Sequence, residues 1–271
     1  DEREQSKLFW NDERLSAGKN PLACGRNNSG IGVGGSTLHF TGYTPRPQPA
    51  DFKTYSEFGA GMDWPIGYND LEPYYDELEI FLGISGPSPY PWGPPRKVAY
   101  PLPPLPLNGA AQLMERGCKI LGIKTSPAAN AILSAPYYQE MIGWRNKWSN
   151  RGFCQAGCST GAKSSMDVTF IPHAVHYGAV IRTECFVTTI ETDVHHQVKA
   201  VLYMQDGKLK RQRCKYLFLC AGAIETPRLL LLYNLANSSG QIGKIFLAHV
   251  GGQGWGEFEE MVHPYKGVPA T

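Results

Sequence analysis

The chain of 271 residues is 42% hydrophobic and 18% charged, and it carries a formal net charge of +2. It is therefore long and apolar enough to bury a core, and its charge balance gives no bias toward nucleic acid or a membrane surface. No run of eighteen apolar residues occurs in the sequence, so we expect no transmembrane helix. The seven cysteines are odd in number and irregularly spaced, which argues against a disulfide framework.

A glycine-rich stretch opens at Gly30, and four of the six residues 30–35 are glycine. Glycine permits positive φ and close approach to a ligand, and the hydroxyls of Ser36 and Thr37 follow at once. Successive backbone N–H groups in such a turn form an anion cradle. His39 and the aromatic residue after it add a titratable ring and a flat face. The pattern favours a phosphate-bearing ligand with a ring system, such as the dinucleotide FAD, and a plain glycine-rich turn is the alternative.

Three helices are expected further along the chain. Asn69 can cap a helix that ends at Gly83, and Asn108 can cap a second that ends at Gly122. A third is expected over about residues 167–177. Residues 86–106 contain nine prolines and predict an ordered surface excursion or a linker.

Strand-like runs follow at residues 180–183, 187–192 and 198–204. A polar turn over residues 193–196 joins the last two runs, and Asp206-Gly207 signals the next hairpin.

Residues 216–220 form a short apolar run that suits a strand buried on both faces. Ala221 and Gly222 are small enough for a sharp turn, and residues 223–232 have the composition of a buried helix with Pro227 in its first turn. A strand that ends in such a turn against a helix N-terminus is where α/β proteins hold ligands. An ordinary βα unit is the alternative.

The G-G-S-T of residues 34–37 and the G-A-I-E-T-P-R-L-L-L of residues 222–231 together resemble the two signatures of the glucose–methanol–choline (GMC) family of FAD-dependent oxidoreductases. The second departs from the pattern at Tyr233-Asn234-Leu235, where the family usually has Ser-Gly. The resemblance covers residues 24–263, and its motifs are specific in this order and weak singly. Further similar runs are residues 63–66, residues 71–75, and residues 242–249, where Ile245 and Ala248 replace polar residues.

The resemblance implies an α/β fold: part of a Rossmann-like FAD-binding domain with an inserted α+β substrate-binding region. Residues 1–51 and 148–240 would form parts of the FAD-binding domain, residues 52–147 the inserted cap region, and residues 241–271 the start of a substrate domain. No strand–G-x-G-x-x-G–helix unit is present, and residues 1–20 are charged and helix-like. We therefore expect an internal part of a longer protein, lacking the N-terminal ADP-binding unit and the C-terminal catalytic segment.

The activity that the resemblance implies is oxidation of the CH–OH group of an alcohol or sugar-like donor, with hydride transfer to flavin N5. The catalytic histidine is expected beyond Thr271, so this chain alone would be inactive. The expected partners are a small-molecule alcohol or sugar and an electron-transfer subunit, without nucleic acid. The alternatives are a noncatalytic module that binds a nucleotide or a partner, and a Rossmann-type NAD enzyme, which the absence of a strand–G-x-G-x-x-G–helix unit disfavours. The sequence assigns no compartment, since it starts at Asp1 rather than at a methionine.

The resemblance also implies which residues hold FAD. The backbone of Val187 would meet the adenine, although an ordinary buried strand valine fits the pattern nearly as well. His39 has the spacing of the pyranose oxidase branch, in which this histidine is joined to the flavin 8α-methyl; noncovalent contact and a purely structural role are the alternatives. The full cofactor-binding set is Gly34, Gly35, Ser36, Thr37, His39, Val187, Ala221 and Gly222.

Cys154 and Cys158 stand four apart in a glycine-punctuated loop. Some GMC-like dehydrogenase subunits carry an iron–sulfur cluster, but two cysteines do not complete such a site. We expect a tight loop here and no metal ligands.

Overall fold

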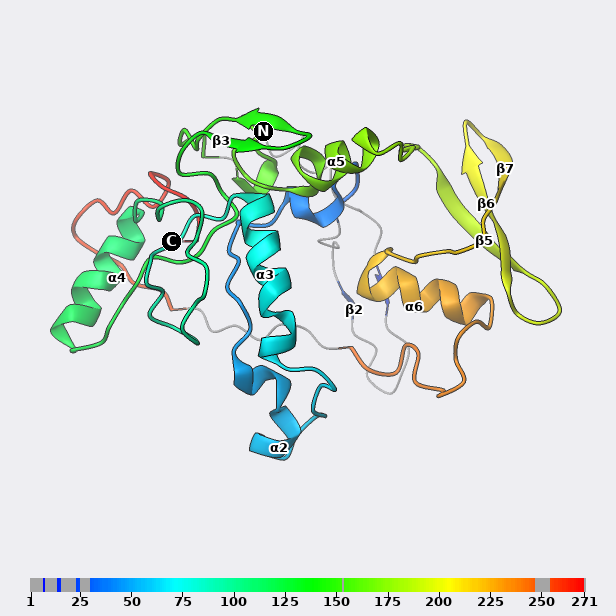
Figure 1. Cartoon of the computed structure of the whole chain (residues 1–271), viewed down its shortest axis with the longest axis horizontal. Coiled ribbons are helices and arrows are strands. Elements are labelled where there is room, and N and C mark those ends of the chain that lie inside the picture. Colours follow the sequence, from blue (N-terminus) through cyan, green and yellow to red (C-terminus); the bar gives the residue numbers. More distant parts are fainter. Residues whose placement is uncertain are drawn as a thin grey trace. The chain divides into compact units, whose positions relative to one another are not determined.

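The computed structural model in Figure 1 describes residues 7, 14–15, 23–24, 30–152, 154–246 and 254–270. The chain divides into two compact units. The first comprises Asp1–Ala179 and Phe258–Thr271, and the second comprises Val180–Glu257.

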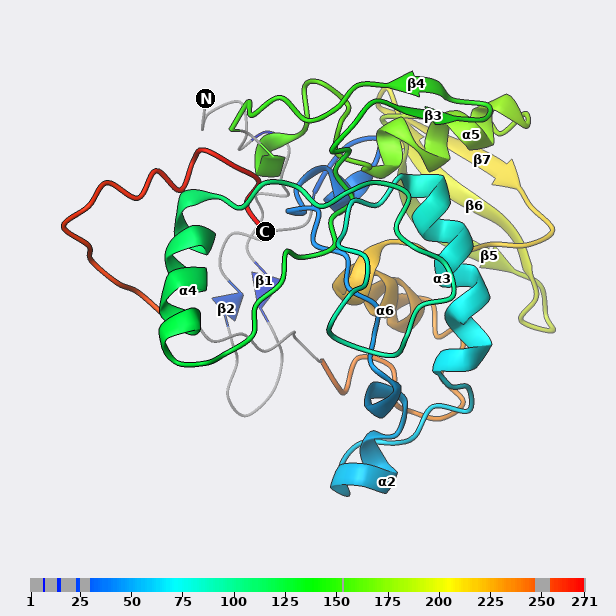
Figure 2. The same cartoon turned by 60° about the vertical axis from the view of Figure 1, so that its left-hand side comes forward.

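The longest helix of the first unit is α3 (Tyr68–Leu82), the cyan helix of Figures 1 and 2. Its N-cap is Gly67, whose N–H donates to the Asp70 carboxylate at 2.8 Å, so the helix begins before the expected cap, Asn69. It ends at Gly83, whose φ of +72° confirms the predicted C-terminus. The short helix α2 (Thr54–Phe58) precedes it.

Helix α4 (Gly109–Ile120) begins as predicted, because Asn108 Oδ1 accepts a hydrogen bond from the Ala111 N–H at 2.9 Å. None of its residues is buried, and Ile120 is 85% exposed. Helix α5 (Phe170–His176) follows the 3₁₀ turn η4 (Met166–Val168), close to the predicted third helix. No helix among the residues described is both long and apolar enough to cross a bilayer.

The proline-rich segment is ordered and contributes to the core of the first unit. Ser85, just before it, forms bridges to Leu102 and to Asn130. The first unit contains two clusters of buried hydrophobic residues. One contains Leu82, Ile84, Tyr100, Ala129 and Ala131, and the other contains Leu105, Ile132 and Val268.

The strands of the first unit are short. Strand β1 (Arg14–Leu15) pairs with β2 (Ala23–Cys24), and β3 (Tyr137–Gln139) pairs with β4 (Gly143–Arg145), both antiparallel. The helix-like expectation for residues 1–20 is wrong at Arg14–Leu15, where antiparallel pairing with Ala23–Cys24 overrides local propensity. Of the rest of that stretch, only Lys7 lies among the described residues.

The second unit is a three-stranded antiparallel sheet and a helix. The sheet order is β5 (Phe186–Thr192), β6 (Val198–Gln205), β7 (Lys208–Arg213), followed by α6 (Gly222–Leu232). Two of the three predicted strands are confirmed. So is the Asp206-Gly207 hairpin, whose φ values of +52° and +69° suit the twist of the strands that it joins.

Three expectations for this unit are wrong. Residues 180–183 form no strand, and Val180 is 77% exposed. Residues 216–220 also form no strand, and Phe218 is 86% exposed. A strand buried on both faces needs pairing neighbours and covering layers, which the described part of this unit does not place beside them. Pro227 lies inside α6 beyond its first turn, so the carbonyl four residues earlier lacks its usual donor.

Candidate functional site

The glycine turn leads into a 3₁₀ helix, η1 (Gly35–Leu38). Gly34 has a φ of +102°, and a Cβ there would lie 3.0 Å from Leu38 Cδ2 and 3.3 Å from the Asp167 backbone N. Gly35 has a φ of +55°, and a Cβ there would point into open space. The turn is therefore packed at Gly34 and open at Gly35.

The hydroxyls beside the glycines hold the turn together. Ser36 Oγ accepts a hydrogen bond from the Gly30 N–H at 3.0 Å. The Thr37 hydroxyl donates to the Gly34 carbonyl at 2.6 Å and accepts from the Met166 N–H at 3.0 Å. Thr37 therefore ties the turn to η4.

His39 is oriented by a long-range hydrogen bond. Its Nδ1 lies 2.8 Å from the carbonyl oxygen of Gln155. A carbonyl only accepts, so Nδ1 carries a proton and the lone pair of the neutral ring is on Nε2. A Cβ on Gly30 would lie 2.8 Å from His39 Cδ2, so the ring requires glycine there.

Lys163 supports the same turn and was not among the residues predicted from the sequence. It is fully buried, and its Nζ donates to the carbonyls of Leu38 at 2.7 Å, Phe40 at 3.0 Å and Cys154 at 2.5 Å. Burial lowers the pKa of this amine, and the negative charges of the Cys154, Cys158 and Asp167 side chains in their ionised forms oppose that shift. A single lysine in a polar loop predicts a solvated side chain, so no local signal marks it.

Cys154 and Cys158 lie in the loop that meets this lysine. Cys158 Sγ accepts from the Lys163 N–H at 3.4 Å and lies 3.5 Å from Thr160 Oγ1. Burial raises the Cys158 pKa, but hydrogen bonds from Thr160 and from backbone N–H groups outweigh it, so the pKa lies below its usual value. Burial, reinforced by the Cys158 charge, raises the pKa of Cys154. No group of three or more metal-ligating side chains is found in the described parts of the chain.

The remaining predicted residues lie in the second unit. Val187 is on the edge strand β5, opposite Tyr203, and the register shifts between Val187 and Thr189. The Ala221 N–H donates to Thr226 Oγ1 at 3.1 Å, and Gly222 begins α6 with a φ of +89°. The structure thus brings Gly34–Thr37 and His39 together in one unit and places Val187, Ala221 and Gly222 in the other.

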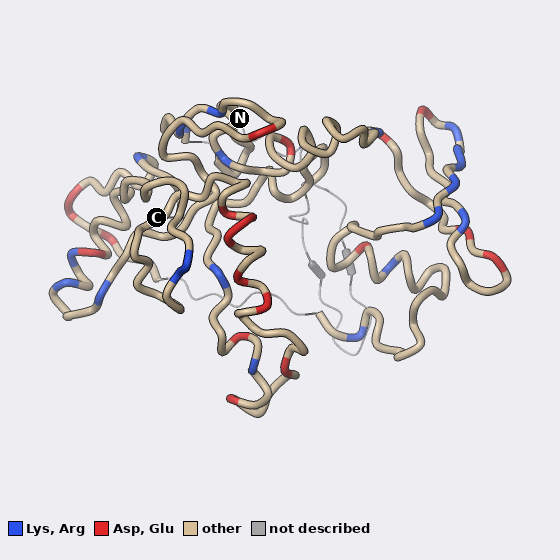
Figure 3. The backbone as a smooth tube through the Cα atoms, viewed as in Figure 1, with Lys and Arg blue, Asp and Glu red and all other residues tan. Residues whose placement is uncertain are grey.

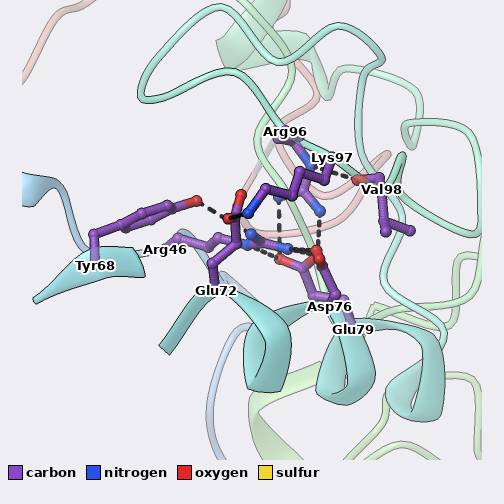
Figure 4. Close-up of polar contacts among 8 residues, drawn as sticks. All are labelled: Arg46, Tyr68, Glu72, Asp76, Glu79, Arg96, Lys97 and Val98. Carbon is purple, nitrogen blue, oxygen red and sulfur yellow. Dashed lines mark hydrogen bonds and ion pairs between the residues drawn. The ribbon is translucent and has the colours of Figure 1, made fainter. Parts of the chain in front are cut away.

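A buried ion-pair network, also not predicted, anchors the chain after the glycine turn (Figure 4). The Arg46 guanidinium lies 2.5 Å from Asp76 and 2.7 Å from Glu79, and Arg96 reaches Glu79 from the proline-rich segment. Glu72, Asp76 and Glu79 all lie on α3, and Lys97 pairs with Glu72. Figure 3 shows the acidic residues following one another along this helix. Burial opposes the Arg46 charge, but hydrogen bonds to Glu79, Asp76 and Tyr68 outweigh it and raise the Arg46 pKa.

An open groove of about 940 Å³ in the first unit is lined mainly by aromatic and apolar side chains of α3, the β3–β4 hairpin and α5. His173 Nδ1 is buried and has no hydrogen-bond partner among the residues described. None of the predicted cofactor residues lines this groove. The candidate site is therefore the glycine turn with its supports.

A family model described as GMC oxidoreductase matches residues 25–251, which include the glycine turn and α6. The chain therefore belongs to the GMC oxidoreductase family. Its mixture of helices and sheet is consistent with the FAD-binding region of that family.

Curated relatives carry the names of alcohol- and sugar-oxidising enzymes. The chain is 32% identical over 230 residues to the fructose dehydrogenase large subunit of Gluconobacter japonicus, covering 81% of this chain and 41% of that protein. It is 33% identical over 231 residues to the 2-methyl-1,2-propanediol dehydrogenase of Mycolicibacterium austroafricanum, with 80% and 40% covered. The 6'''-hydroxyparomomycin C oxidase of Streptomyces lividus is 29% identical over 237 residues, with 82% and 40% covered. The chain thus spans about two fifths of the length of these relatives.

Proposed function

We propose that this chain forms part of the flavin-binding region of an enzyme that oxidises the CH–OH group of an alcohol or a sugar-like donor. The observation that carries the proposal is the glycine turn, which is closed on itself by its own hydroxyls and open at Gly35. Bound FAD supplies the hydride acceptor at flavin N5. The residues of this chain bind and orient it.

The groups around the turn fit a dinucleotide. A side chain at Gly35 would enter the open space where we place the ligand. Asp167, which packs against Gly34, has a buried Oδ1 with no hydrogen-bond partner among the described residues. A carboxylate oxygen in that state is an acceptor for a ligand hydroxyl or N–H. Because both hydroxyls are engaged within the turn, we assign Ser36 and Thr37 mainly to holding its shape.

His39 is the residue that we place against the flavin. With its proton held on Nδ1 by the Gln155 carbonyl, the neutral ring has its lone pair on Nε2. This nitrogen can accept a hydrogen bond, and it is a competent nucleophile toward an activated flavin methyl. Noncovalent contact and attachment at the 8α-methyl are both compatible with that tautomer.

In the second unit, we assign Val187, Ala221 and Gly222 to contact with the cofactor. Strand β5 is at the edge of its sheet among the described residues, and we assign the backbone of Val187 on this strand to the adenine. Ala221 and Gly222 begin α6 without a bulky side chain, which suits close approach of a pyrophosphate to a helix N-terminus.

We place the proton acceptor for the alcohol in the family's catalytic histidine, outside residues 1–271. The large-subunit name of the Gluconobacter relative supports a partner subunit that takes the electrons onward.

The test is to purify the native-length protein and record its visible spectrum. We expect a flavin spectrum that bleaches anaerobically with an alcohol or sugar from a panel containing D-fructose, a vicinal diol and an amino sugar. Acid precipitation then shows whether the flavin is covalently attached. A yellow wild-type pellet and a colourless His39→Ala pellet indicate a covalent bond to His39, and a colourless wild-type pellet rules that bond out. A protein without flavin would refute the proposal. Flavin that no CH–OH donor reduces would favour a noncatalytic binding module.

A further inference from the structure

We propose that Lys163 is a positioning residue for His39, and that its buried ammonium holds the imidazole in the orientation and tautomer that face the flavin. This inference rests on the proposed function only in placing FAD at His39. The lysine itself has no contact with a reacting atom in this assignment.

The ammonium group is completely satisfied by backbone oxygens. An ammonium has three N–H donors, and Lys163 Nζ has three carbonyl partners, at 2.5 to 3.0 Å. A lysine is almost never fully buried unless its charge is compensated in this way. The three bonds thus explain why this side chain is 0% exposed.

The identity of the three partners gives the lysine its role. Leu38 and Phe40 directly flank His39, so two of the bonds fix the backbone on either side of the imidazole. The third bond holds Cys154, and the next residue, Gln155, provides the carbonyl that accepts from His39 Nδ1. One buried charge therefore joins both ends of the hydrogen bond that sets the histidine tautomer.

Hydrogen bonds of the backbone around Lys163 hold this side chain in place. Its own N–H donates to Cys158 Sγ at 3.4 Å. The adjacent Ser164 donates from its hydroxyl to the Leu82 carbonyl at 2.6 Å and from its N–H to the Ala131 carbonyl at 2.8 Å. The Phe40 ring centroid lies 5.2 Å from Nζ, within the range of a cation–π interaction. Removing the charge would release three buried carbonyls and free the Gln155 carbonyl from its present position.

The first measurement is the ¹⁵N spectrum of the His39 ring in the native-length protein. We expect the neutral ring to carry its proton on Nδ1 in the wild type and to become a mixture of tautomers in Lys163→Met. Lys147→Met is the matched control, because Lys147 is an exposed lysine of the same unit. The wild-type pattern retained in Lys163→Met would overturn the assignment, and this measurement does not require bound flavin.

The second measurement is a double-mutant cycle on FAD affinity. Lys163→Met should raise the FAD dissociation constant about tenfold in the wild-type background and less than about twofold in the His39→Ala background, because coupled residues are not additive. Equal fold-changes in the two backgrounds would show that the lysine acts independently of His39. Wild-type protein that binds no FAD would instead refute the proposed function and leave the tautomer result standing.

Lys163→Gln is a second variant for the case that Lys163→Met does not fold, because its shorter amide side chain keeps N–H donors and removes the charge. It should retain the folded state, monitored by its thermal unfolding transition, and still show the mixed tautomers. If neither variant folds, the lysine serves the fold as a whole and the assignment is wrong.

Discussion

Two neighbouring glycines in the turn meet different surroundings, although the sequence presents them as equivalent. A Cβ at Gly34 would contact Leu38 and Asp167, whereas a Cβ at Gly35 would contact no atom within 4 Å. Both have positive φ, which costs a side chain energy in either case. Only the structure separates the glycine needed for packing from the one that we assign to the ligand.

Gly35→Ala should therefore impair FAD binding more than stability. We expect a fall of about 1 kcal/mol in the free energy of unfolding, from backbone strain alone, and a rise of about tenfold in the FAD dissociation constant. Gly34→Ala should lower the free energy of unfolding by about 3 kcal/mol, because strain and steric contact add. Urea denaturation and flavin-fluorescence titration measure the two quantities. An unchanged FAD affinity in Gly35→Ala would place the ligand elsewhere.

The two thiols of the Lys163 loop should differ in reactivity. Hydrogen bonds to Cys158 lower its pKa, and burial with a nearby charge raises that of Cys154. Since the thiolate is the reactive form, Cys158 should be alkylated several-fold faster at about pH 7.5 and should reach its full rate at a lower pH. Iodoacetamide labelling with peptide mass spectrometry measures both. Urea-denatured protein is the control, in which the rates should converge, and faster labelling of Cys154 in the native state would contradict this account.

At the scale of elements, local signals predicted local structure well. Asn108, Gly83 and the Asp206-Gly207 turn were identified because each cap or turn is decided by a few adjacent residues. Residues 180–183 and 216–220 were mistaken for strands, because apolar composition does not specify a pairing partner. Lys163 and Arg46 were missed for the related reason that their partners lie far away in the sequence.

The Arg46–Glu79–Arg96 network joins the chain after the glycine turn, α3 and the proline-rich segment, and all three side chains are at most 9% exposed. Glu79→Gln should lower the free energy of unfolding by about 3 kcal/mol, because it leaves two buried guanidinium groups without their shared carboxylate. Glu260→Gln is the matched control: it breaks an ion pair with Arg116 whose side chains are 61% and 57% exposed, and it should cost less than about 1 kcal/mol. Equal costs in urea denaturation would mean that the network contributes little.

Strand β5 gives a second prediction at this scale. Val187→Ala keeps the backbone N–H and should barely change flavin retention, whereas Val187→Pro removes it and should weaken retention clearly. Leu209→Pro, on the opposite edge strand of the same sheet, controls for damage to the sheet. Flavin retention after gel filtration is the readout. Equal loss in both proline variants, or none in either, would remove Val187 from the proposed site.

At the scale of the whole molecule, the chain leaves the first unit at Ala179 and returns to it at Phe258. The returning segment is held by side chains from distant parts of that unit. Asn108 Nδ2 donates to the Val268 carbonyl at 2.9 Å, and Asn130 Nδ2 donates to the Ala270 carbonyl at 2.7 Å. The functional boundaries predicted at residues 51, 147 and 240 follow other criteria and stay a prediction.

A substitution at Val268 tests whether the two units unfold independently of each other. Its side chain is fully buried against Leu105 and Ile132, so Val268→Ala should leave a cavity and destabilise the first unit by about 2 kcal/mol. If the units open independently, hydrogen exchange should accelerate in residues 105–132 and stay unchanged in strands β5–β7. Met261→Ala, in the same segment but with the side chain 78% exposed, should change neither. Acceleration of equal size in β5–β7 would mean that both units unfold as one cooperative structure, in which the returning segment stabilises the whole chain.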